Sequence, residues 1–491
     1  MKDVHNNNNF FSSWSIAGFD PSCGSGTAAD IKTFQALNVP LQCIATAWTF
    51  QNQNQCFSWE ALSQEQIKLQ IEALLESEFP RIIKIGMVGA QKTVELLGEF
   101  LSYSKKKVVI YDPVLCSSSG GWLIEKDAIQ GIKEKILPHV DILTPNRNEV
   151  ELFLGKKIPS EEDYEEAVQY FLNLGVKSVL LKGGHFESQM SCDLWSDGKE
   201  KFWLSVPRMK GASPRGTGCT FSSAIAAYLA QGHQMRDAIV LAKAYISQCI
   251  RLSTLASLNY SPWHKNLNDF PLLSKLFHEI SKLYHFPDCG RQPLGFYPIV
   301  PRVHWLKKLL SLGVKTAQLR IKDLKGIDLE EEIKTAVQIS KEYECRLFIN
   351  DYWNLAIKYN AYGVHLGQED LDAADIQAIN KSSLRLGISS HSFYEVARAR
   401  SINPSYIAYG PIYPTTCKSM KFGPQGVEKL GEIRQLIQSP LVAIGGLNLD
   451  RLPQVMACGV DGYAVISDVL DHAHPLQRCT DWLLACARPL C

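Results

Sequence analysis

The chain has 491 residues, too long for one ordinary hydrophobic core, and this predicts two or three domains. A hydrophobic share of 46% and a charged share of 21% are typical of globular proteins, and a net charge of +1 gives no reason to expect a nucleic-acid partner. Without an apolar span of about 18 residues or a signal peptide, we expect a cytoplasmic protein with no membrane partner. The 14 cysteines occur singly, without C-x-x-C pairs or zinc spacing, which indicates reduced thiols.

The first half of the chain alternates short apolar runs with helical stretches. Residues 1–12 are polar, include four consecutive asparagines and predict a disordered lead. From 13 to 262 the alternation predicts a mostly parallel α/β/α sheet covered by helices. The expected strands are Ser15–Ala17, Cys43–Ala47, Ile82–Ile85, Val108–Ile110, Ile142–Leu143 and Ser178–Leu181. The next segment, 263–293, contains several prolines and little strand signal, so we expect a linker with some helix.

The second half, 294–491, contains eight apolar runs, each followed by enough residues for a helix. They are Phe296–Val300, Thr316–Leu319, Leu347–Ile349, Gly363–Leu366, Leu384–Ile388, Tyr406–Tyr409, Leu441–Ile444 and Gly462–Val465. This eightfold β/α alternation predicts a (β/α)8 TIM barrel, in which catalytic groups sit at the carboxyl ends of the strands.

The clearest local motif of the first half is Arg215-Gly-Thr-Gly-Cys-Thr220, followed by an apolar helical run. Glycines at a helix start let backbone N–H groups converge on an anion, assisted by the helix dipole. The same motif is compatible with an ordinary helix cap, and Cys219 with a small buried residue.

Three further stretches accompany this motif. They are Ile16-Ala-Gly-Phe-Asp20, Thr144-Pro-Asn-Arg-Asn-Glu149 and Leu181-Lys-Gly-Gly-His185. Together, over about residues 14–260, the four stretches resemble the ribokinase-like superfamily, and specifically hydroxymethylpyrimidine/phosphomethylpyrimidine kinase. The resemblance implies a kinase that uses ATP and Mg²⁺ to phosphorylate 4-amino-5-hydroxymethyl-2-methylpyrimidine twice.

The resemblance also implies site residues. Cys219 would be the base, favoured by the lowered pKa expected of a thiol at a helix N-terminus, and Lys182 would stabilise the transferring phosphate. The remaining implied residues are Gly216, Thr217 and Gly218 for the phosphate, Asn146 and Glu149 for magnesium through water, and Gly18, Asp30 and Gln51 for the pyrimidine. Arg215 departs from the family, where histidine is common at this position.

The second half carries an alternating polar motif, Gln318-Leu-Arg-Ile-Lys322. In a strand, this alternation sends an amide, a guanidinium and an ammonium to one face, which suits a diphosphate. Asp351 and Asp370 each follow an apolar run, as Mg²⁺ bridging to phosphate oxygens requires. Taken alone, the motif also fits a solvated edge strand.

Seven ordered motifs, including Phe348-Ile-Asn-Asp351, His365-Leu-Gly-Gln-Glu-Asp370 and Val442-Ala-Ile-Gly-Gly446, resemble thiamine-phosphate synthase over about residues 294–485. The resemblance implies that hydroxymethylpyrimidine diphosphate ionises and that a thiazole phosphate captures the cation, giving thiamine phosphate and pyrophosphate. The implied residues for the pyrimidine diphosphate are Gln318, Leu319, Arg320, Ile321, Lys322, Asn350, Ser389 and Lys418, with Asp351 and Asp370 as metal ligands. Those implied for the thiazole phosphate are Thr415, Thr416, Cys417, Gly446, Ile466 and Ser467.

In the implied synthase half, Cys417 departs from the family pattern, because a weak thiol donor replaces a hydroxyl. We interpret His391 as structural. These resemblances predict a bifunctional thiamine-biosynthesis enzyme in which the kinase makes the diphosphate that the barrel consumes, with small-molecule substrates as its partners.

The alternatives are a barrel that only senses ligand, a barrel with thiazole tautomerase activity, and a kinase for pyridoxine. The sequence is compatible with a homo-oligomer and leaves open whether the diphosphate is channelled.

Overall fold

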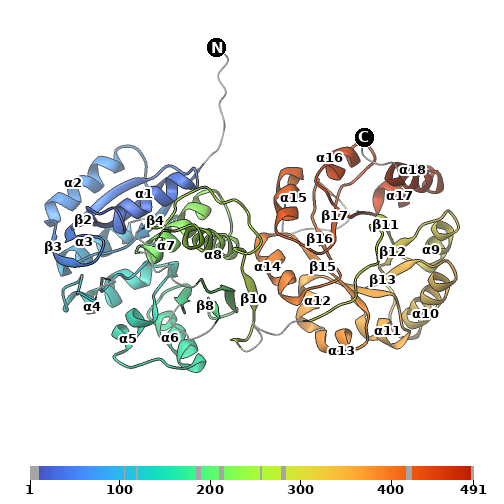
Figure 1. Ribbon diagram of the computed structural model, residues 1–491, viewed down its shortest axis with the longest axis horizontal. Helices are drawn as coiled ribbons and strands as arrows, with labels where there is room; N and C mark the ends of the chain where they lie inside the picture. The colour runs from blue at the N-terminus through green and yellow to red at the C-terminus, as the bar shows by residue number, and fades with distance from the viewer. Residues whose placement is uncertain are drawn as a thin grey trace, which may run out of the picture. The chain divides into compact units, whose positions relative to one another are not determined.

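The computed structural model describes residues 10–103, 106–117, 120–183, 189–209, 215–254, 257–277, 284–415 and 423–487 (Figure 1). The chain divides into two compact units, Met1–Ile280 and Ser281–Cys491. Within the described residues, no helix has both the length and the apolar character needed to span a bilayer.

The first unit is built on one sheet whose strands lie in the order β10-β9-β8-β7-β6-β5-β4-β1-β2-β3. The strands are β1 (Ser13–Phe19), β2 (Gln42–Gln51), β3 (Cys56–Ala61), β4 (Ile82–Ile85), β5 (Val108–Tyr111), β6 (Ile142–Leu143), β7 (Val179–Lys182), β8 (Met190–Ser196), β9 (Lys201–Pro207) and β10 (Leu272–Ser274). Six neighbouring strands, in the order β2-β1-β4-β5-β6-β7, are parallel, so their carboxyl ends share one edge of the sheet.

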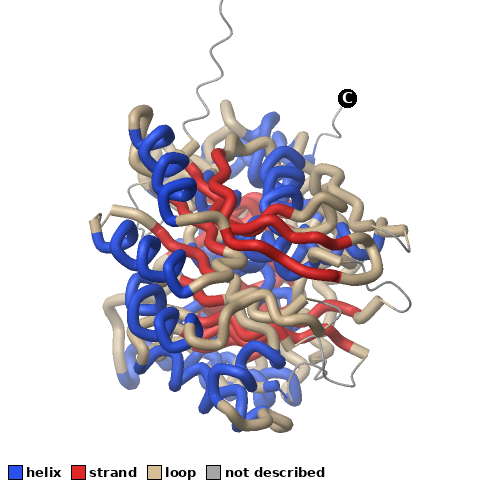
Figure 2. The backbone as a smooth tube through the Cα atoms, turned by 90° about the vertical axis from the view of Figure 1, so that its left-hand side faces the viewer, coloured by secondary structure: helices blue, strands red, loops and turns tan. Residues whose placement is uncertain are grey.

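Helices cover the strands of this sheet (Figure 2). They are α1 (Gly26–Ala36), α2 (Gln64–Leu75), α3 (Gln91–Ser102), α4 (Ala128–Gly131), α5 (Arg147–Leu154), α6 (Glu161–Asn173), α7 (Thr217–Ala230) and α8 (Met235–Arg251), with a π turn at Ile132–Ile136 and a 3-10 turn at Leu137–His139. Capping boxes begin α2, α5 and α6, each pairing an N-cap side chain with a residue three positions later. Helix α7 is buried on nearly every side, which fits its almost uniformly apolar or small residues.

The mostly parallel sheet expected from the sequence is confirmed, and every expected strand is present. Four antiparallel strands were not expected: β3, β8, β9 and β10. The segment interpreted as a linker supplies one of them, because β10 pairs with β9. The end of the expected disordered lead is also attached, since the Phe11 N–H donates to Ala230 O and the Ser12 carbonyl accepts from Arg81 and Ile82. Residues 1–9 lie outside the described part.

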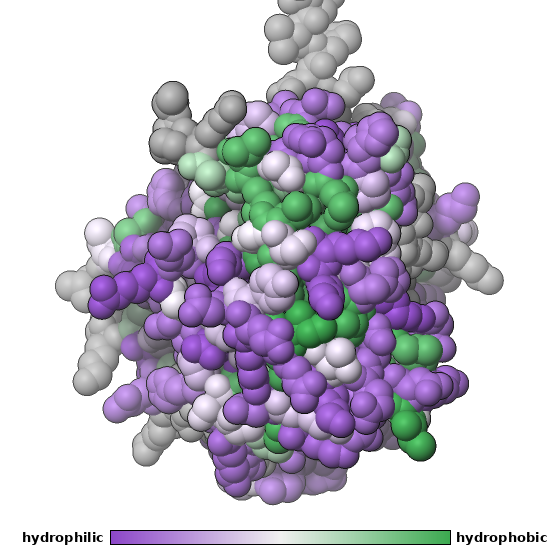
Figure 3. Space-filling model, turned by 90° about the vertical axis from the view of Figure 1, so that its right-hand side faces the viewer, coloured by the Kyte–Doolittle hydropathy of each residue, from purple (hydrophilic) through white to green (hydrophobic). Residues whose placement is uncertain are grey.

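The second unit is a closed barrel of eight parallel strands, which confirms the expected (β/α)8 fold. The strands are β11 (Gly295–Val300), β12 (Thr316–Leu319), β13 (Arg346–Asn350), β14 (Gly363–Leu366), β15 (Arg385–Ser390), β16 (Tyr406–Tyr409), β17 (Leu441–Ile444) and β18 (Gly462–Val465). The helices are α9 (Val303–Leu310), α10 (Gly326–Glu342), α11 (Trp353–Lys358), α12 (Gln368–Ala373), α13 (Ile376–Lys381), α14 (Phe393–Ile402), α15 (Gly426–Gln435), α16 (Leu452–Met456), α17 (Ser467–Leu470) and α18 (Pro475–Ala487). The face of this unit in Figure 3 is largely hydrophilic, with hydrophobic patches among the polar side chains.

Aromatic rings fill the barrel interior. Phe348 contacts Tyr406 edge to face, with ring centroids 5.0 Å apart, and Tyr297 lies 6.0 Å from the same ring. Two glycines make the space: a Cβ on Gly387 would overlap the Tyr406 ring, and a Cβ on Gly363 would overlap the Phe348 ring. The interior is therefore filled by a few large side chains, as the close packing of protein interiors requires.

Candidate active sites

In the first unit, three polar side chains meet where parallel strands end. Asp112 follows β5 directly and is buried. Its Oδ1 lies 2.8 Å from the Nζ of Lys182, the last residue of β7, and accepts a 3.3 Å hydrogen bond from Thr144, which follows β6. Burial opposes the charged form of Lys182, but Asp112 and Glu149 nearby outweigh it and raise the pKa of the ammonium. A fixed positive charge therefore stands at this edge of the sheet.

Next to this pair, Asn146 and Glu149 form the capping box of α5. The Glu149 N–H donates to Asn146 Oδ1 at 2.9 Å, and the Asn146 N–H donates to Glu149 Oε2 at 2.7 Å. Burial raises the pKa of Glu149 to about 8; Lys182 opposes the shift and Asp112 adds to it. Burial and the neighbouring Asp112 carboxylate disfavour the ionised form of Glu149. A cation bound nearby would stabilise that form.

The glycine-rich start of α7 faces the same edge. Gly216 is the N-cap residue with φ 81°, and a Cβ there would overlap the carbonyl of Gly24. A Cβ on Gly218 would lie 3.2 Å from Lys182 Nζ. The absence of side chains thus brings the first N–H groups of α7 close to the lysine, an arrangement suited to phosphate.

Cys219, in the first turn of α7, does not have the lowered pKa that its place at a helix start predicts. Burial raises the pKa of the thiol to about 11. Lys84 and a hydrogen bond from the Gly26 backbone oppose the shift, while Asp112 and Asp30 add to it. Desolvation and two carboxylates therefore outweigh these two opposing effects, and the thiol is protonated at neutral pH.

We expect Cys219 to alkylate slowly at pH 7–8 and its rate to rise as pH approaches 11, because only the thiolate is a strong nucleophile. Iodoacetamide labelling, with mass-spectrometric counting of the Cys219 peptide, measures this rate. Cys23, partly exposed in the loop after β1, is the internal comparison and should react faster at pH 8. Labelling of Cys219 that has already reached its plateau rate at pH 7 would contradict the raised pKa.

Asp30, expected to contact the pyrimidine, is instead fully buried. Lys84 Nζ lies 2.9 Å from both of its carboxylate oxygens, and the hydroxyls of Ser15 and Ser223 donate to it at 2.5 and 2.6 Å. The carboxylate is saturated by partners from β1, β4 and α7, so it ties these elements together. The expected contact of Asp30 with the pyrimidine stays a prediction, and in this structure its carboxylate oxygens are bonded to side chains of the protein.

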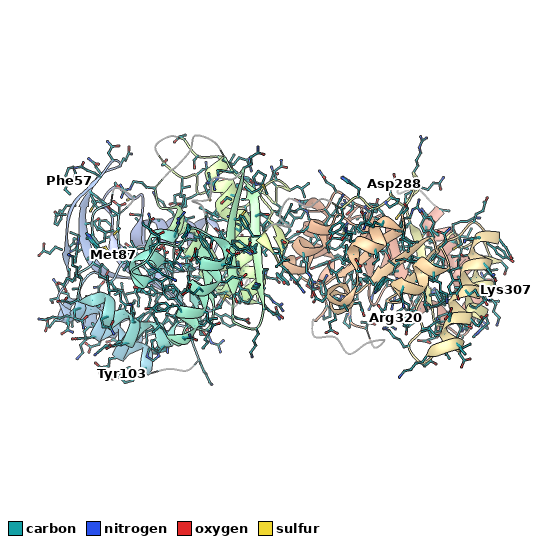
Figure 4. The ribbon with its side chains drawn as sticks, turned by 90° about the horizontal axis from the view of Figure 1, so that it is seen from below. Phe57, Met87, Tyr103, Asp288, Lys307 and Arg320 are labelled. Atoms are coloured by element: carbon teal, nitrogen blue, oxygen red, sulfur yellow. The ribbon has the colours of Figure 1, made fainter. Side chains whose placement is uncertain are left out.

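Gly18 and Gln51, the other two expected pyrimidine contacts, lie at the ends of β1 and β2. A Cβ on Gly18 would lie 2.9 Å from the sulfur of Met87, which is labelled in Figure 4. The Gln51 amide nitrogen donates to Thr49 Oγ1 at 2.8 Å, and its oxygen accepts from Arg215. Arg215 also donates to the Asn52 carbonyl, so the residue that departs from the family pattern fixes the orientation of this amide.

In the barrel, the polar motif lies where β12 ends. Gln318 is a buried residue of β12, and Arg320, labelled in Figure 4, lies just beyond the strand and is held by its N–H to the Val300 carbonyl at 2.8 Å. Lys322 Nζ lies 2.5 Å from an Asp351 carboxylate oxygen. The solvated-strand interpretation does not fit, since Gln318 is inside the barrel and Lys322 meets the end of the next strand.

Two carboxylates stand together on this rim. Asp351 follows β13 with φ 66°, and its N–H donates to the His365 carbonyl at 2.9 Å. Burial raises the pKa of Asp370, and the nearby Asp351 raises it further. Among the described residues, no group of three or more His, Cys, Asp and Glu side chains is arranged to hold a metal. A cation here would thus need ligands from substrate and water in addition to these two carboxylates.

Ser389, at the end of β15, belongs to a buried hydrogen-bonded group. Its Oγ lies 2.8 Å from His365 Nε2, and His365 Nδ1 lies 2.7 Å from the Tyr406 hydroxyl. Burial lowers the pKa of His365 to about 4, with Asp351 opposing the shift. His391 Nδ1 lies 2.7 Å from Glu395 at the start of α14, which is consistent with the structural interpretation.

Two parts of the predicted thiazole-phosphate site are described. Gly446 has φ 66°, and a Cβ there would lie 2.6 Å from the Pro414 carbonyl, so only glycine fits. Ile466 is the N-cap residue of α17, which begins at Ser467. Thr415 precedes the undescribed segment, and Thr416, Cys417 and Lys418 lie outside the described residues.

Several residues of these sites were missed by the sequence analysis. Asp112 follows an apolar run directly, the same signal that pointed to Asp351. His365 lies within the motif His365-Leu-Gly-Gln-Glu-Asp370, but the sequence pattern alone predicts no role for it. Lys84 and Tyr406 are part of apolar runs, and no sequence signal distinguishes them from ordinary core residues.

The fold and the two candidate sites are those of a two-domain α/β enzyme, with one candidate site at the carboxyl ends of the parallel strands in each domain. The family model described as "Phosphomethylpyrimidine kinase" matches residues 20–266, and that described as "Thiamine monophosphate synthase" matches residues 297–469. Thiamine-phosphate synthase from Photorhabdus laumondii is 52% identical over 200 residues, 40% of this chain and 88% of that protein. The synthase from Serratia proteamaculans is 50% identical over 198 residues, 40% of this chain and 90% of that protein.

Two solved kinase structures resemble the first unit. Phosphomethylpyrimidine kinase from Clostridium difficile 630 is 35% identical with a TM-score of 0.44, covering 49% of this chain and 99% of that chain. Pyridoxal kinase from Staphylococcus aureus in complex with ADP is 26% identical with a TM-score of 0.49, covering 54% of this chain and 99% of that chain.

The chain belongs to the phosphomethylpyrimidine kinase family through its first half and to the thiamine-phosphate synthase family through its second. It is a bifunctional enzyme of thiamine biosynthesis that phosphorylates the hydroxymethylpyrimidine and couples the product to the thiazole phosphate.

Proposed function

We propose that ATP and Mg²⁺ serve the kinase half, that Mg²⁺ serves the synthase half, and that the residues at the two strand edges carry the chemistry. The single observation that supports this most is the repetition of one pattern: in each unit, a lysine pairs with an aspartate at the ends of parallel strands. The pairs are Lys182 with Asp112 at 2.8 Å and Lys322 with Asp351 at 2.5 Å.

In the kinase half, Lys182 and the N–H groups of Gly216, Thr217 and Gly218 hold the transferring phosphoryl group. Phosphoryl transfer relies mainly on positioning and charge stabilisation, which a lysine and a helix start supply. Glu149, with Asn146, would hold magnesium through water, and the metal would neutralise charge on the nucleotide phosphates.

The remaining groups of the kinase half act on the pyrimidine. Gln51, oriented by Arg215, hydrogen-bonds to the ring, and Gly18, where a Cβ would crowd the Met87 sulfur, lies beside it. Cys219 lies at the reacting hydroxyl and accepts its proton only in the thiolate form. Because the pKa of the thiol is raised, that form is a small fraction at neutral pH, but a loose transition state needs little help from a base.

In the synthase half, the leaving diphosphate collects negative charge as the bond to the pyrimidine breaks. Arg320 and Lys322 stabilise that charge, with Lys418 as a further proposed contact and Ser389 donating a hydroxyl hydrogen. Asp351 and Asp370 would hold Mg²⁺, which needs only one or two carboxylates when phosphate oxygens and water complete its shell, and which neutralises the diphosphate.

The other substrate groups of the synthase are held nearby. Gln318 and Asn350 orient the pyrimidine, and the flanking Leu319 and Ile321 shape its side of the rim. Thr415, Gly446, Ile466 and Ser467 hold the thiazole phosphate, with Thr416 and Cys417 as further proposed contacts. Backbone N–H groups are the main donors here, because glycines let the chain approach a phosphate closely.

A coupled assay on the full chain tests the assignment. Wild type, given hydroxymethylpyrimidine, ATP, Mg²⁺ and thiazole phosphate, should form thiamine phosphate. Lys182→Ala should form it only when the pyrimidine diphosphate is supplied, and Asp351→Asn should accumulate that diphosphate. A mixture of the two variants should recover product if the diphosphate is released to solvent.

Each contrary outcome of this assay has a distinct meaning. Wild type that stops at the diphosphate would show that the barrel does not couple the substrates. Lys182→Ala that phosphorylates the pyrimidine at the wild-type rate would overturn the kinase assignment. Full activity after removal of divalent metal with EDTA would overturn the proposed role of Mg²⁺.

A further inference from the structure

A row of five polar side chains crosses the interior of the barrel. Gln318 Nε2 donates to the Tyr297 hydroxyl at 3.4 Å, and that hydroxyl lies 2.8 Å from the Tyr406 hydroxyl. The Tyr406 hydroxyl lies 2.7 Å from His365 Nδ1, and His365 Nε2 lies 2.8 Å from Ser389 Oγ. The five come from β12, β11, β16, β14 and β15 in that order, so the row joins the Gln318 side of the barrel to the Ser389 side.

The row is enclosed. Tyr297, Tyr406, Gln318 and His365 are all at most 5% exposed, and only Ser389, at its end, is partly open. The Tyr406 ring lies against Gly387 and edge to face with Phe348, which leaves the hydroxyl one position. Buried polar groups of this kind keep their hydrogen bonds, because an unpaired hydroxyl hydrogen inside a protein is costly.

The direction of every hydrogen bond in the row follows from its first member. With the Gln318 amide nitrogen facing Tyr297, the Tyr297 hydroxyl accepts from it; either tyrosine could donate in the next bond, and we assign the Tyr297 hydrogen to its other partner, Tyr406. The Tyr406 hydrogen then goes to His365 Nδ1, which must carry a lone pair. With this orientation of the amide, the reverse direction, or a ring with hydrogen on both nitrogens, would leave the Tyr297 hydrogen unpaired in the core.

This direction determines whether the Ser389 hydroxyl can donate a hydrogen bond to a ligand. A neutral ring with a lone pair on Nδ1 carries its hydrogen on Nε2, and that hydrogen goes to Ser389 Oγ. The Ser389 hydroxyl then accepts from His365 and keeps its own hydrogen for the site. In the other tautomer, with hydrogen on Nδ1, the Ser389 hydroxyl would donate its hydrogen to the ring. Only its lone pairs would then face the site, and these repel an anion.

We propose that Tyr297, Tyr406 and His365 are positioning residues that keep the Ser389 hydroxyl a hydrogen-bond donor toward the leaving diphosphate. The same pattern has the Gln318 amide nitrogen inward and its oxygen toward the pyrimidine. The proposal rests on the proposed function of the barrel rim.

The tautomer is measured directly and without substrate. In the full chain labelled with ¹⁵N histidine, His365 should show a protonated Nε2 and an unprotonated Nδ1. Comparison with His365→Gln assigns its signals among those of the 12 histidines. In Tyr406→Phe the preference for this tautomer should be lost. A proton on Nδ1 of His365 in wild type would overturn the proposal, whatever the barrel catalyses.

Kinetics test the consequence. Tyr406→Phe and Tyr297→Phe should each lower synthase kcat/KM for the pyrimidine diphosphate, by about 10- to 100-fold for the former, while KM for the thiazole phosphate stays unchanged. Ser389→Ala should lower it similarly. In the Ser389→Ala background, Tyr406→Phe should cause little further loss, because it acts through the missing hydroxyl.

Two controls separate this result from a general packing defect. Tyr362→Phe removes a hydroxyl bonded to the Cys289 carbonyl at the amino-terminal end of the strands and should leave synthase activity unchanged. Kinase activity on the same chain should be unchanged in every variant. Additive losses from Tyr406→Phe and Ser389→Ala would overturn the proposal, whereas an inactive wild-type barrel would instead refute the proposed function.

Discussion

Asp351→Asn is expected to lower the synthase kcat by about 100- to 1,000-fold, the usual cost of removing one group that stabilises developing charge. Asparagine tolerates the left-handed backbone at this position, where φ is 66°, about as well as aspartate does, so the fold of the rim should survive. The variant loses the charge that pairs with Lys322 and that would ligate Mg²⁺ beside Asp370. Discontinuous assay of thiamine phosphate from supplied diphosphate measures the loss.

The matched control for this variant is Asp323→Asn. Asp323 lies on the same rim, pairs with Arg302 and is largely exposed, so its replacement should change kcat less than about threefold. Kinase turnover should be unchanged in both variants. If Asp351→Asn and Asp323→Asn behaved alike, the charge at 351 would not be part of the coupling reaction.

Lys84→Met is expected to destabilise the first unit by about 3–5 kcal/mol, the range for breaking a buried ion pair on one side. Both side chains of the Lys84–Asp30 pair are 0% exposed. Although burial opposes its charged form, Asp30 beside it raises the pKa of Lys84, so the ammonium is charged at neutral pH. Methionine would leave the Asp30 carboxylate buried with only two hydroxyl donors. Urea unfolding of the full chain, followed by kinase activity and tryptophan fluorescence, measures the change.

A second substitution tests the cause of that change. Lys84→Met combined with Asp30→Leu should be more stable than Lys84→Met alone, because the unpaired charge is gone. Synthase activity reports the integrity of the barrel. It should be lost at the same urea concentration in the variants as in wild type. A single variant within about 1 kcal/mol of wild type would mean that water or another cation satisfies Asp30.

The parallel strands of both units were predictable, because each is a short apolar run followed by a helical pattern. The antiparallel strands were not predictable, because they lie at the two edges of the first unit's sheet and mix polar with apolar residues. In β3, for example, no residue is fully buried. The β8–β9 hairpin did carry a signal, Asp197-Gly198 between two short strands, which favours a tight turn.

The candidate site residues also divide into those that the sequence predicts and those that only the folded structure reveals. Asp351 was predictable because a carboxylate after a buried strand of a β/α unit lies at the catalytic end. The ion pair between Asp30 and Lys84 was not predictable. These residues lie 54 positions apart in the sequence, and only the folded sheet brings them together. The raised pKa of Cys219 depends on burial and on two carboxylates from other elements, which the local sequence at the helix start does not reveal.

Gly387 has no side chain of its own, and the space it leaves is occupied by the ring of Tyr406 on the neighbouring strand. The two positions are therefore constrained as a pair. A larger residue at 387 requires a smaller one at 406, and any smaller residue there gives up the hydroxyl that bridges Tyr297 and His365. In related enzymes that keep the serine donor, glycine and tyrosine at these positions should be inherited together, and a change at one should be accompanied by a change at the other.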